Sequence, residues 1–256
     1  MADCKSVTTP MKPGLHLTAE MDANSNEKIA AMKKIPYCNA MDALSYVAET
    51  TRPDICYATG VLARYCINPE EAHWKAVKHV FRYLQGTKDK KLVYKPDDGK
   101  ELFTSFTDAN YEGDKNTDQS TGGYLIKFDI GAVSWSSKLQ PLVALSTTEA
   151  EYIAAVEAGK EMVWMRQLLI EFGITIKSPS ILRIDNQSAI SVSKNPEYHG
   201  RMKHLDLKYF WLRDQVTFGV ITPMFVSTEN MSADLLTKAM ARVKMEQFRR
   251  MMGIEP

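Results

Sequence analysis

The sequence predicts a mixed α/β protein, in which a small helical unit precedes a mixed β-sheet with helices packed on it. In the first third of the chain, apolar residues recur at helical spacing. After Lys88 the pattern changes to strands, followed by a long helix, a strand, helices, a strand and closing helices. At 256 residues the chain can form one large domain or two small ones.

The composition is that of an ordinary globular protein, with 45% hydrophobic and 25% charged residues. A net charge of +1 argues against a strongly basic nucleic-acid binder but allows a local basic face. The four cysteines lie far apart, which predicts reduced thiols in an intracellular protein and argues against a structural zinc site. The sequence has no apolar run of membrane-spanning length and no signal-peptide core, so we expect no membrane partner.

Two units are predicted in the first 90 residues. Residues 1–36 lack a periodic apolar pattern and are expected to be an extended or irregular lead-in. Residues 37–90 are expected to form a unit of three helices, with Arg52-Pro53-Asp54 between the first two. The third helix should have Asn68 as its N-cap and end at Gly86.

The remaining residues, 91–256, are predicted to contain the sheet. Strands are expected where apolar and polar residues alternate, or where short apolar runs are bounded by turn signals. A long helix should run from about Thr147 to Phe172. The expected strands cover residues 92–94, 102–107, 122–128, 132–137, 181–184 and 220–226, with further helices at 187–193 and 205–218.

Four acidic residues lie where strands end or helices begin, and they form the candidate site. Carboxylates brought to one sheet edge from separate elements are the ligands that hard divalent cations take. Singly, each acid has an ordinary explanation as a turn, capping or helix-terminus residue, so the argument depends on the set. The order of the set points to a metal-dependent nuclease. The four are Asp108, Glu151, Asp185 and Asp234.

The pattern alone leaves a choice between Glu149 and Glu151. Two capping boxes fit the start of the long helix, one joining Ser146 to Glu149 and the other joining Thr148 to Glu151. Two residues apart on a helix, the two carboxylates point about 200° apart, so only one can face the sheet edge. Whichever glutamate caps the helix leaves the other for the site.

Short motifs surround and connect the acids. They are Asp108-Ala109-Asn110-Tyr111, Ser120-Thr121-Gly122-Gly123-Tyr124, Ser134-Trp135-Ser136-Ser137-Lys138-Leu139-Gln140, Leu145 to Tyr152, Asp185-Asn186-Gln187-Ser188-Ala189, Lys203-His204-Leu205-Asp206 and Ala233-Asp234-Leu235-Leu236-Thr237-Lys238. Together they resemble the ribonuclease H domain of Ty1/copia-type retrotransposon Pol polyproteins. Upstream, Arg52 to Ile55, His73-Trp74 and Arg82 to Thr87 look like the segment that joins the polymerase to that domain.

The resemblance covers nearly the whole chain and implies its organisation. Residues 91–256 would form a ribonuclease H-like five-stranded mixed sheet with flanking helices. Residues 37–90 would be a helical connection unit, and residues 1–36 a lead-in from the polymerase edge. The polymerase of the same polyprotein is the implied partner. The chain has no Tyr-x-Asp-Asp segment, so we do not expect it to synthesise DNA alone.

The resemblance also implies the chemistry. It selects Glu151 over Glu149, so that Asp108, Glu151, Asp185 and Asp234 would be both the metal ligands and the catalytic residues. The implied reaction is two-metal hydrolysis of the RNA strand of an RNA–DNA hybrid by an endonuclease that uses two Mg²⁺ ions, or Mn²⁺ in their place. The implied location is an intracellular particle or the nucleus.

Five further residues are candidates for binding the hybrid. A ribonuclease of this kind must read 2′-hydroxyls across a wide, shallow minor groove. Asn186 and Gln187, beside Asp185, are placed to do so, although helix capping explains them equally well. Ser146 is a weaker candidate of the same kind, and two lysines are candidates for phosphate contacts. These lysines are Lys138 and Lys203.

One departure from the family pattern concerns proton transfer. Cellular relatives carry a mobile histidine in the loop before the last aspartate, whereas this loop reads Ser227-Thr228-Glu229-Asn230. Glu229 is the residue in it that could carry a proton.

Three other functions compete with the nuclease. The first is a catalytically silent module that binds hybrid and is left from a retrotransposon fragment. The second is an integrase-type nuclease, which the position of the glutamate as second of the four acids disfavours. The third is a protein-interaction module whose helical unit packs against the polymerase.

Overall fold

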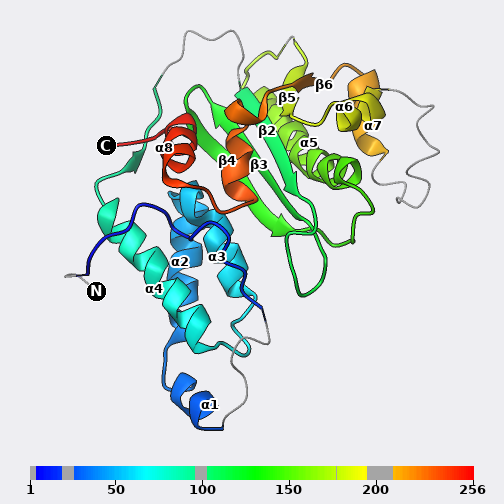
Figure 1. Cartoon of the computed structure of the whole chain (residues 1–256). Coiled ribbons are helices and arrows are strands. Elements are labelled where there is room, and N and C mark those ends of the chain that lie inside the picture. The colour runs from blue at the N-terminus through cyan, green and yellow to red at the C-terminus, as the bar shows by residue number, and fades with distance from the viewer. Residues whose placement is uncertain (1–3, 19–25, 96–102, 177, 195–209) are drawn as a thin grey trace.

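A five-stranded mixed sheet forms the centre of the molecule (Figure 1). The computed structural model describes residues 4–18, 26–95, 103–176, 178–194 and 210–256. In the strand order β4-β3-β2-β5-β6, the first three strands pair antiparallel, and β2, β5 and β6 pair parallel. The strands are β2 (Phe103–Asn110), β3 (Thr121–Phe128), β4 (Gly131–Leu139), β5 (Ser180–Ile184) and β6 (Ile221–Phe225).

Helices cover both faces of the sheet, so the predicted fold class is confirmed. One face packs against α5 (Thr147–Glu171), α6 (Gln187–Lys194) and α7 (Trp211–Thr217). The other face packs against α2 (Tyr37–Thr50), η1 (Pro53–Ile55), α3 (Cys56–Ala63), α4 (Glu71–Gly86), η5 (Ser232–Leu236) and α8 (Arg242–Met251). Short strands β1 (Lys91–Leu92) and β7 (Ile254–Glu255) pair with each other.

Strand alternation divides the core between the two faces. Neighbouring residues of a strand point to opposite sides of the sheet. Accordingly, Leu125 of β3 lies in the core shared with the helical unit, and Ile126 lies in the core under α5. The helices of residues 37–90 therefore share a core with one face of the sheet. The division of the chain into three units stays a prediction.

Several local expectations are corrected by the structure. The lead-in contains a helix, α1 (Asn26–Met32), and α7 covers only the described end of the helix expected at 205–218. The expected N-cap Asn68 is wrong. Glu70 caps α4, because its carboxylate accepts the His73 backbone N–H while its own N–H donates to His73 Nδ1 at 3.0 Å. This reciprocal pair satisfies two backbone donors, which a single Asn cap does not.

A buried ion pair joins the helical unit to the C-terminal helix. Arg52 donates from Nε and Nη2 to the two carboxylate oxygens of Asp54, each at 2.8 Å. The Tyr83 hydroxyl donates to Asp54 Oδ2 at 2.5 Å and accepts from Arg249 of α8 at 3.2 Å. Arg52 Nη2 also donates to Thr87 Oγ1 at 2.8 Å. We call these five residues the paired cluster.

Two further features agree with the sequence. All four cysteines are free thiols. Among the residues that the structure describes, none of the helices is both long and apolar enough to span a bilayer.

Candidate active site

The sheet topology brings acidic side chains together at one edge. β2 and β5 are adjacent and parallel, so their carboxyl ends lie at the same edge. Asp108 lies near the end of β2, and Asp185 directly follows β5. Carboxylate oxygens of Asp108, Asp185 and Asp234 all lie within 4.8 Å of one another. Three of the four predicted acids thus converge on one point.

Asp234 reaches this edge because the short helix η5 packs unusually close to β3. Gly123 of β3 is the register partner of Asp108. A Cβ on Gly123 would lie 2.8 Å from Leu236 Cβ and 2.9 Å from Thr237 Cγ2, closer than side-chain carbons approach. The glycine therefore permits the contact that places Asp234 beside Asp108.

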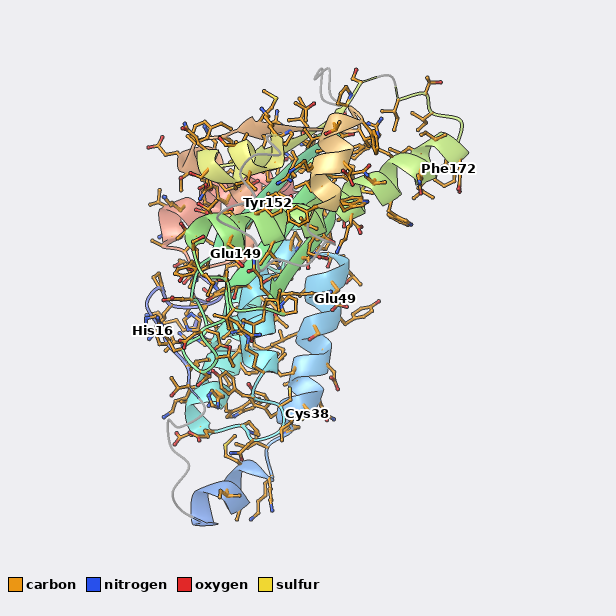
Figure 2. All side chains as sticks on the ribbon, turned by 90° about the vertical axis from the view of Figure 1, so that its right-hand side faces the viewer. His16, Cys38, Glu49, Glu149, Tyr152 and Phe172 are labelled. Carbon is orange, nitrogen blue, oxygen red and sulfur yellow. The ribbon has the colours of Figure 1, made fainter. Side chains whose placement is uncertain are left out.

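Glu151 is presented by the first turns of α5, and the helix cap decides its direction. Ser146 caps α5, since its Oγ accepts the Glu149 N–H at 3.2 Å. Glu149 turns back and accepts the Leu145 N–H at 3.0 Å. Figure 2 shows Glu149 at this end of α5. Glu151 is left to face the strand, where the Ala109 N–H donates to it and its Oε2 has no hydrogen-bond partner.

Burial and mutual repulsion dominate the electrostatics of the acids. Burial, then Asp108 and Asp185, raise the pKa of Glu151 to about 9. Burial and Asp108 raise the pKa of Asp234 to about 7, and the same two causes raise the pKa of Asp185. The carboxyl groups therefore resist ionisation together unless a cation joins them. We call these four residues the acid cluster.

Lys238 supplies a cation from within the chain. It lies four residues after Asp234, and its Nζ is 2.7 Å from Asp234 Oδ1 and 3.8 Å from Asp108 Oδ2. Burial acts to lower the pKa of Lys238, but the two aspartates outweigh it and raise the pKa. Among the described residues, Lys238 is thus the ammonium that offsets part of the negative charge of Asp108 and Asp234.

Two threonine hydroxyls orient the acids, and local sequence patterns do not reveal this role. Thr237 Oγ1 donates to Asp108 Oδ2. Thr228 Oγ1 donates to Asp185 Oδ2 at 2.9 Å. Thr237 stands in one of the quoted motifs, three residues after Asp234 and hence one helical turn on, so spacing could have identified it. Thr228 is 43 residues from its partner and only the fold brings them together.

The acid cluster fits divalent cations. Its donors are hard carboxylate oxygens, and those of Asp108, Asp185 and Asp234 lie within 4.8 Å of one another. The unpartnered Oε2 of Glu151 is a buried acceptor that a cation or its water would satisfy.

The predicted substrate-binding residues have mixed surroundings. Asn186 caps α6 through Oδ1, which accepts the Ala189 N–H at 2.9 Å, and Ser146 caps α5. Gln187 is exposed on the first turn of α6, next to the acids, and Lys138 is exposed on the edge strand β4. Lys203 lies outside the described residues.

Comparisons with known proteins agree with the motifs. No family model matches the sequence. The chain is 43% identical, over 99% of its length, to the Retrovirus-related Pol polyprotein from transposon TNT 1-94 of Nicotiana tabacum, and 37% identical over 99% to that from transposon RE2 of Arabidopsis thaliana. It spans 19% and 17% of these relatives. Among solved structures, the chain aligns with the N-terminal RNase H domain of a Mycobacterium tuberculosis protein, which was determined as a fusion with maltose-binding protein. The TM-score is 0.35 and the identity 13%, over 58% of this chain and 96% of that one.

Proposed function

Because the chain belongs to the Ty1/copia-type retrotransposon Pol polyproteins, as a C-terminal part of them, we propose that it is a ribonuclease H. In this proposal it is an endonuclease that cuts the RNA strand of RNA–DNA hybrids. The supporting observation is the convergence of Asp108, Asp185 and Asp234 within 4.8 Å, beside the buried Glu151.

The four acids would hold two Mg²⁺ ions, or Mn²⁺ in their place. When bound, such a pair activates water and stabilises the leaving 3′ oxygen of the RNA. The protein's part is to hold the four carboxyl groups in fixed positions, and the bound cations would favour their ionised forms. β2 and β5 hold Asp108 and Asp185 on rigid strands, and the cap at Ser146 keeps Glu151 turned inward.

Other residues would orient the site and its substrate. The hydroxyls of Thr237 and Thr228 fix the rotation of two carboxylates and stabilise their charged forms. Gln187 would reach a 2′-hydroxyl of the RNA, with Asn186 through its amide nitrogen. Glu229, exposed in the loop before Asp234, would carry a proton in place of the missing histidine.

The proposed function extends to the organisation of the chain, its protein partner and its location. Residues 1–36 would lead in from the polymerase, residues 37–90 would connect, and residues 91–256 would be the nuclease. The polymerase part of the polyprotein would be the protein partner. The protein would act inside the cell, in a particle or the nucleus.

A hybrid-cleavage assay with Mg²⁺ tests the proposal. The wild type should cut the RNA strand, and Asp185→Asn and Glu151→Gln should lose cutting by about a hundred-fold or more, as expected for groups that stabilise transition-state charge. Glu149→Gln is the matched control, because glutamine can still accept the Leu145 N–H, so its activity should stay near that of the wild type. Equal cutting by wild type and Asp185→Asn would contradict the site.

The silent binding module remains the alternative, and Lys238 favours it. Its ammonium already neutralises part of the cluster without metal, at 2.7 Å from Asp234. A wild-type protein that binds hybrid but does not cut it with Mg²⁺ or Mn²⁺ would decide for this alternative.

A further inference from the structure

Two hollows share part of their walls, and nearly all of the charged side chains that line them are basic. The larger, about 630 Å³, lies between residues 10–17 and α4. The smaller, about 150 Å³, lies between residues 14–17, α3 and the end of β2. Leu15 and Leu17 line both, so the two hollows adjoin across this segment. The smaller one also includes Lys238, which touches the acids.

The charge of these linings departs sharply from that of the chain. Overall, 32 Lys and Arg balance 31 Asp and Glu. The larger hollow is lined by four Lys or Arg and no acid, and the smaller by three against one Asp. These seven, which we call the basic track, are Lys12, Lys75, Lys78 and Arg82, then Arg64, Lys115 and Lys238.

Some of the track is already paired within the protein. Lys75 lies 2.7 Å from Glu71, and Arg64 lies 3.1 Å from Asp114. Lys12 and Lys78 line the larger hollow, Lys115 lines the smaller one, and all three are exposed. Lys78 Nζ lies 6.0 Å from the centroid of the Trp74 ring. Because all three side chains are exposed, their ammonium groups can reach a ligand.

The wall of the track is fixed in place. The segment before α1 makes a turn in which the Leu15 N–H donates to the Lys12 carbonyl, and Gly14 there has φ of +73°. Its ends are held to the helical unit, since Tyr65 donates to the Leu17 carbonyl at 2.7 Å and His79 Nε2 lies 3.0 Å from the Thr9 carbonyl. The hollows are thus built into the fold, and a ligand would find their shape prepared.

The track reaches the acid cluster at Lys238, which lines the smaller hollow and lies 2.7 Å from Asp234 Oδ1. In Figure 2, His16, which also lines the smaller hollow, is labelled on the left of the view. A polyanion that followed the two hollows would pass from α4 to Lys238 and the acids.

We propose that the basic track binds the sugar-phosphate backbone of the hybrid on its way to the acids, so that the helical unit and the lead-in are part of the substrate-binding surface. This inference rests on the ribonuclease H function proposed above. The chemistry is that of phosphate contacts, which set affinity and register without reading sequence. The apolar floor, with Met11 and Leu17, would face sugar rather than phosphate.

Hybrid binding at several salt concentrations tests the proposal. A labelled hybrid is titrated with the full chain carrying Asp185→Asn, in EDTA, so that no cutting occurs. The test variant is Lys12→Gln/Lys78→Gln/Lys115→Gln in that background. The matched control removes three exposed lysines elsewhere. It is Lys33→Gln/Lys34→Gln/Lys244→Gln.

The test variant should bind on the order of ten-fold more weakly at low salt, and the slope of log affinity against log salt should fall by roughly one for each lost contact. The effect should grow with hybrid length, since short hybrids cannot reach from the acids to α4. Unchanged binding by the test variant, or an equal loss in the control, would overturn the proposal that the track binds the hybrid. In that case, binding of an acidic peptide that the three substitutions abolish would identify the hollow as a protein site. No binding of hybrid by the parent protein would instead reject the ribonuclease H function itself.

Discussion

The acid cluster and the paired cluster both bury charged groups, but they treat the charges in opposite ways. In the paired cluster, Arg52 meets both oxygens of Asp54, and Tyr83, Thr87 and Arg249 supply further hydrogen bonds. In the acid cluster, three aspartates face one another, and Lys238 is the basic side chain that contacts them among the residues that the structure describes. The first arrangement pairs opposite charges, whereas the second gathers like charges, which added cations would balance.

The contrast indicates which region holds the fold and which performs chemistry. A complete buried pair resists change, because removing one member strands the other without solvent. Like charges held close together repel one another and destabilise the fold, and folded proteins tolerate this cost at functional sites. A substitution in one cluster should therefore change the property that this cluster supports and leave the other cluster intact.

The largest effect should come from breaking the paired cluster. Asp54→Asn leaves Arg52 buried without a counter-charge and should lower the free energy of unfolding by about 3–5 kcal/mol. Urea denaturation measures this. Glu246→Gln, which breaks the exposed helical pair with Arg242, is the control and should leave the midpoint unchanged within error. An equally small effect of Asp54→Asn would show that the buried pair contributes no more to stability than the exposed pair.

The next effect should come from completing the acid cluster. Mg²⁺ at about a hundred times its dissociation constant should raise the free energy of unfolding by about 2.7 kcal/mol, by mass action. Asp185→Asn removes one ligand, so the same Mg²⁺ concentration should give a much smaller rise. Thermal unfolding in Mg²⁺ and in EDTA measures the difference. An equal rise in both proteins would place the metal outside the acid cluster.

The sequence predicted the acids better than it predicted what holds them. Asp108 and Asp185 follow strand-like runs, and local alternation suffices to place such residues at a sheet edge. The family motifs, rather than periodicity, selected Glu151, and the cap at Ser146 gives the physical reason.

Contacts between distant segments could not be predicted in the same way. Thr237 and Asp108 lie 129 residues apart, and their hydrogen bond depends on the close approach that Gly123 allows. Periodicity marks Arg52-Pro53-Asp54 only as a break between helices, because the partners of Asp54, Tyr83 and through it Arg249, come from other elements. Local patterns encode the elements, while packing decides which polar groups meet.

A smaller effect should appear in the pH dependence of the metal-free protein. Because the pKa of Glu151 is raised to about 9 in the fold, the folded state holds this proton more tightly than the unfolded state. Stability should therefore fall as the pH rises from the normal glutamate range towards 9. Glu151→Gln should remove part of this slope and should be more stable than the wild type at pH 8 in EDTA. Glu149→Gln should keep the slope; a loss of the slope there would assign the effect to the wrong glutamate.

The smallest effects should come from removing one threonine hydroxyl from beside each cluster. Thr228→Val removes the hydrogen bond to Asp185, which acts to lower the pKa of that acid. Because Thr228 is exposed, the free energy of unfolding should change by no more than about 0.5 kcal/mol, while Mg²⁺ binding weakens a few-fold.

Thr87→Val is the counterpart of this variant in the paired cluster, where the buried Thr87 hydroxyl accepts a hydrogen bond from Arg52. It should lower stability by about 1–3 kcal/mol and leave Mg²⁺ binding unchanged, because the stranded donor is buried. Calorimetry measures Mg²⁺ binding by both variants, and urea denaturation measures their stability. Thr228→Val should mainly lose Mg²⁺ binding, and Thr87→Val should mainly lose stability. Equal loss of stability in the two would mean that the acid cluster also holds the fold.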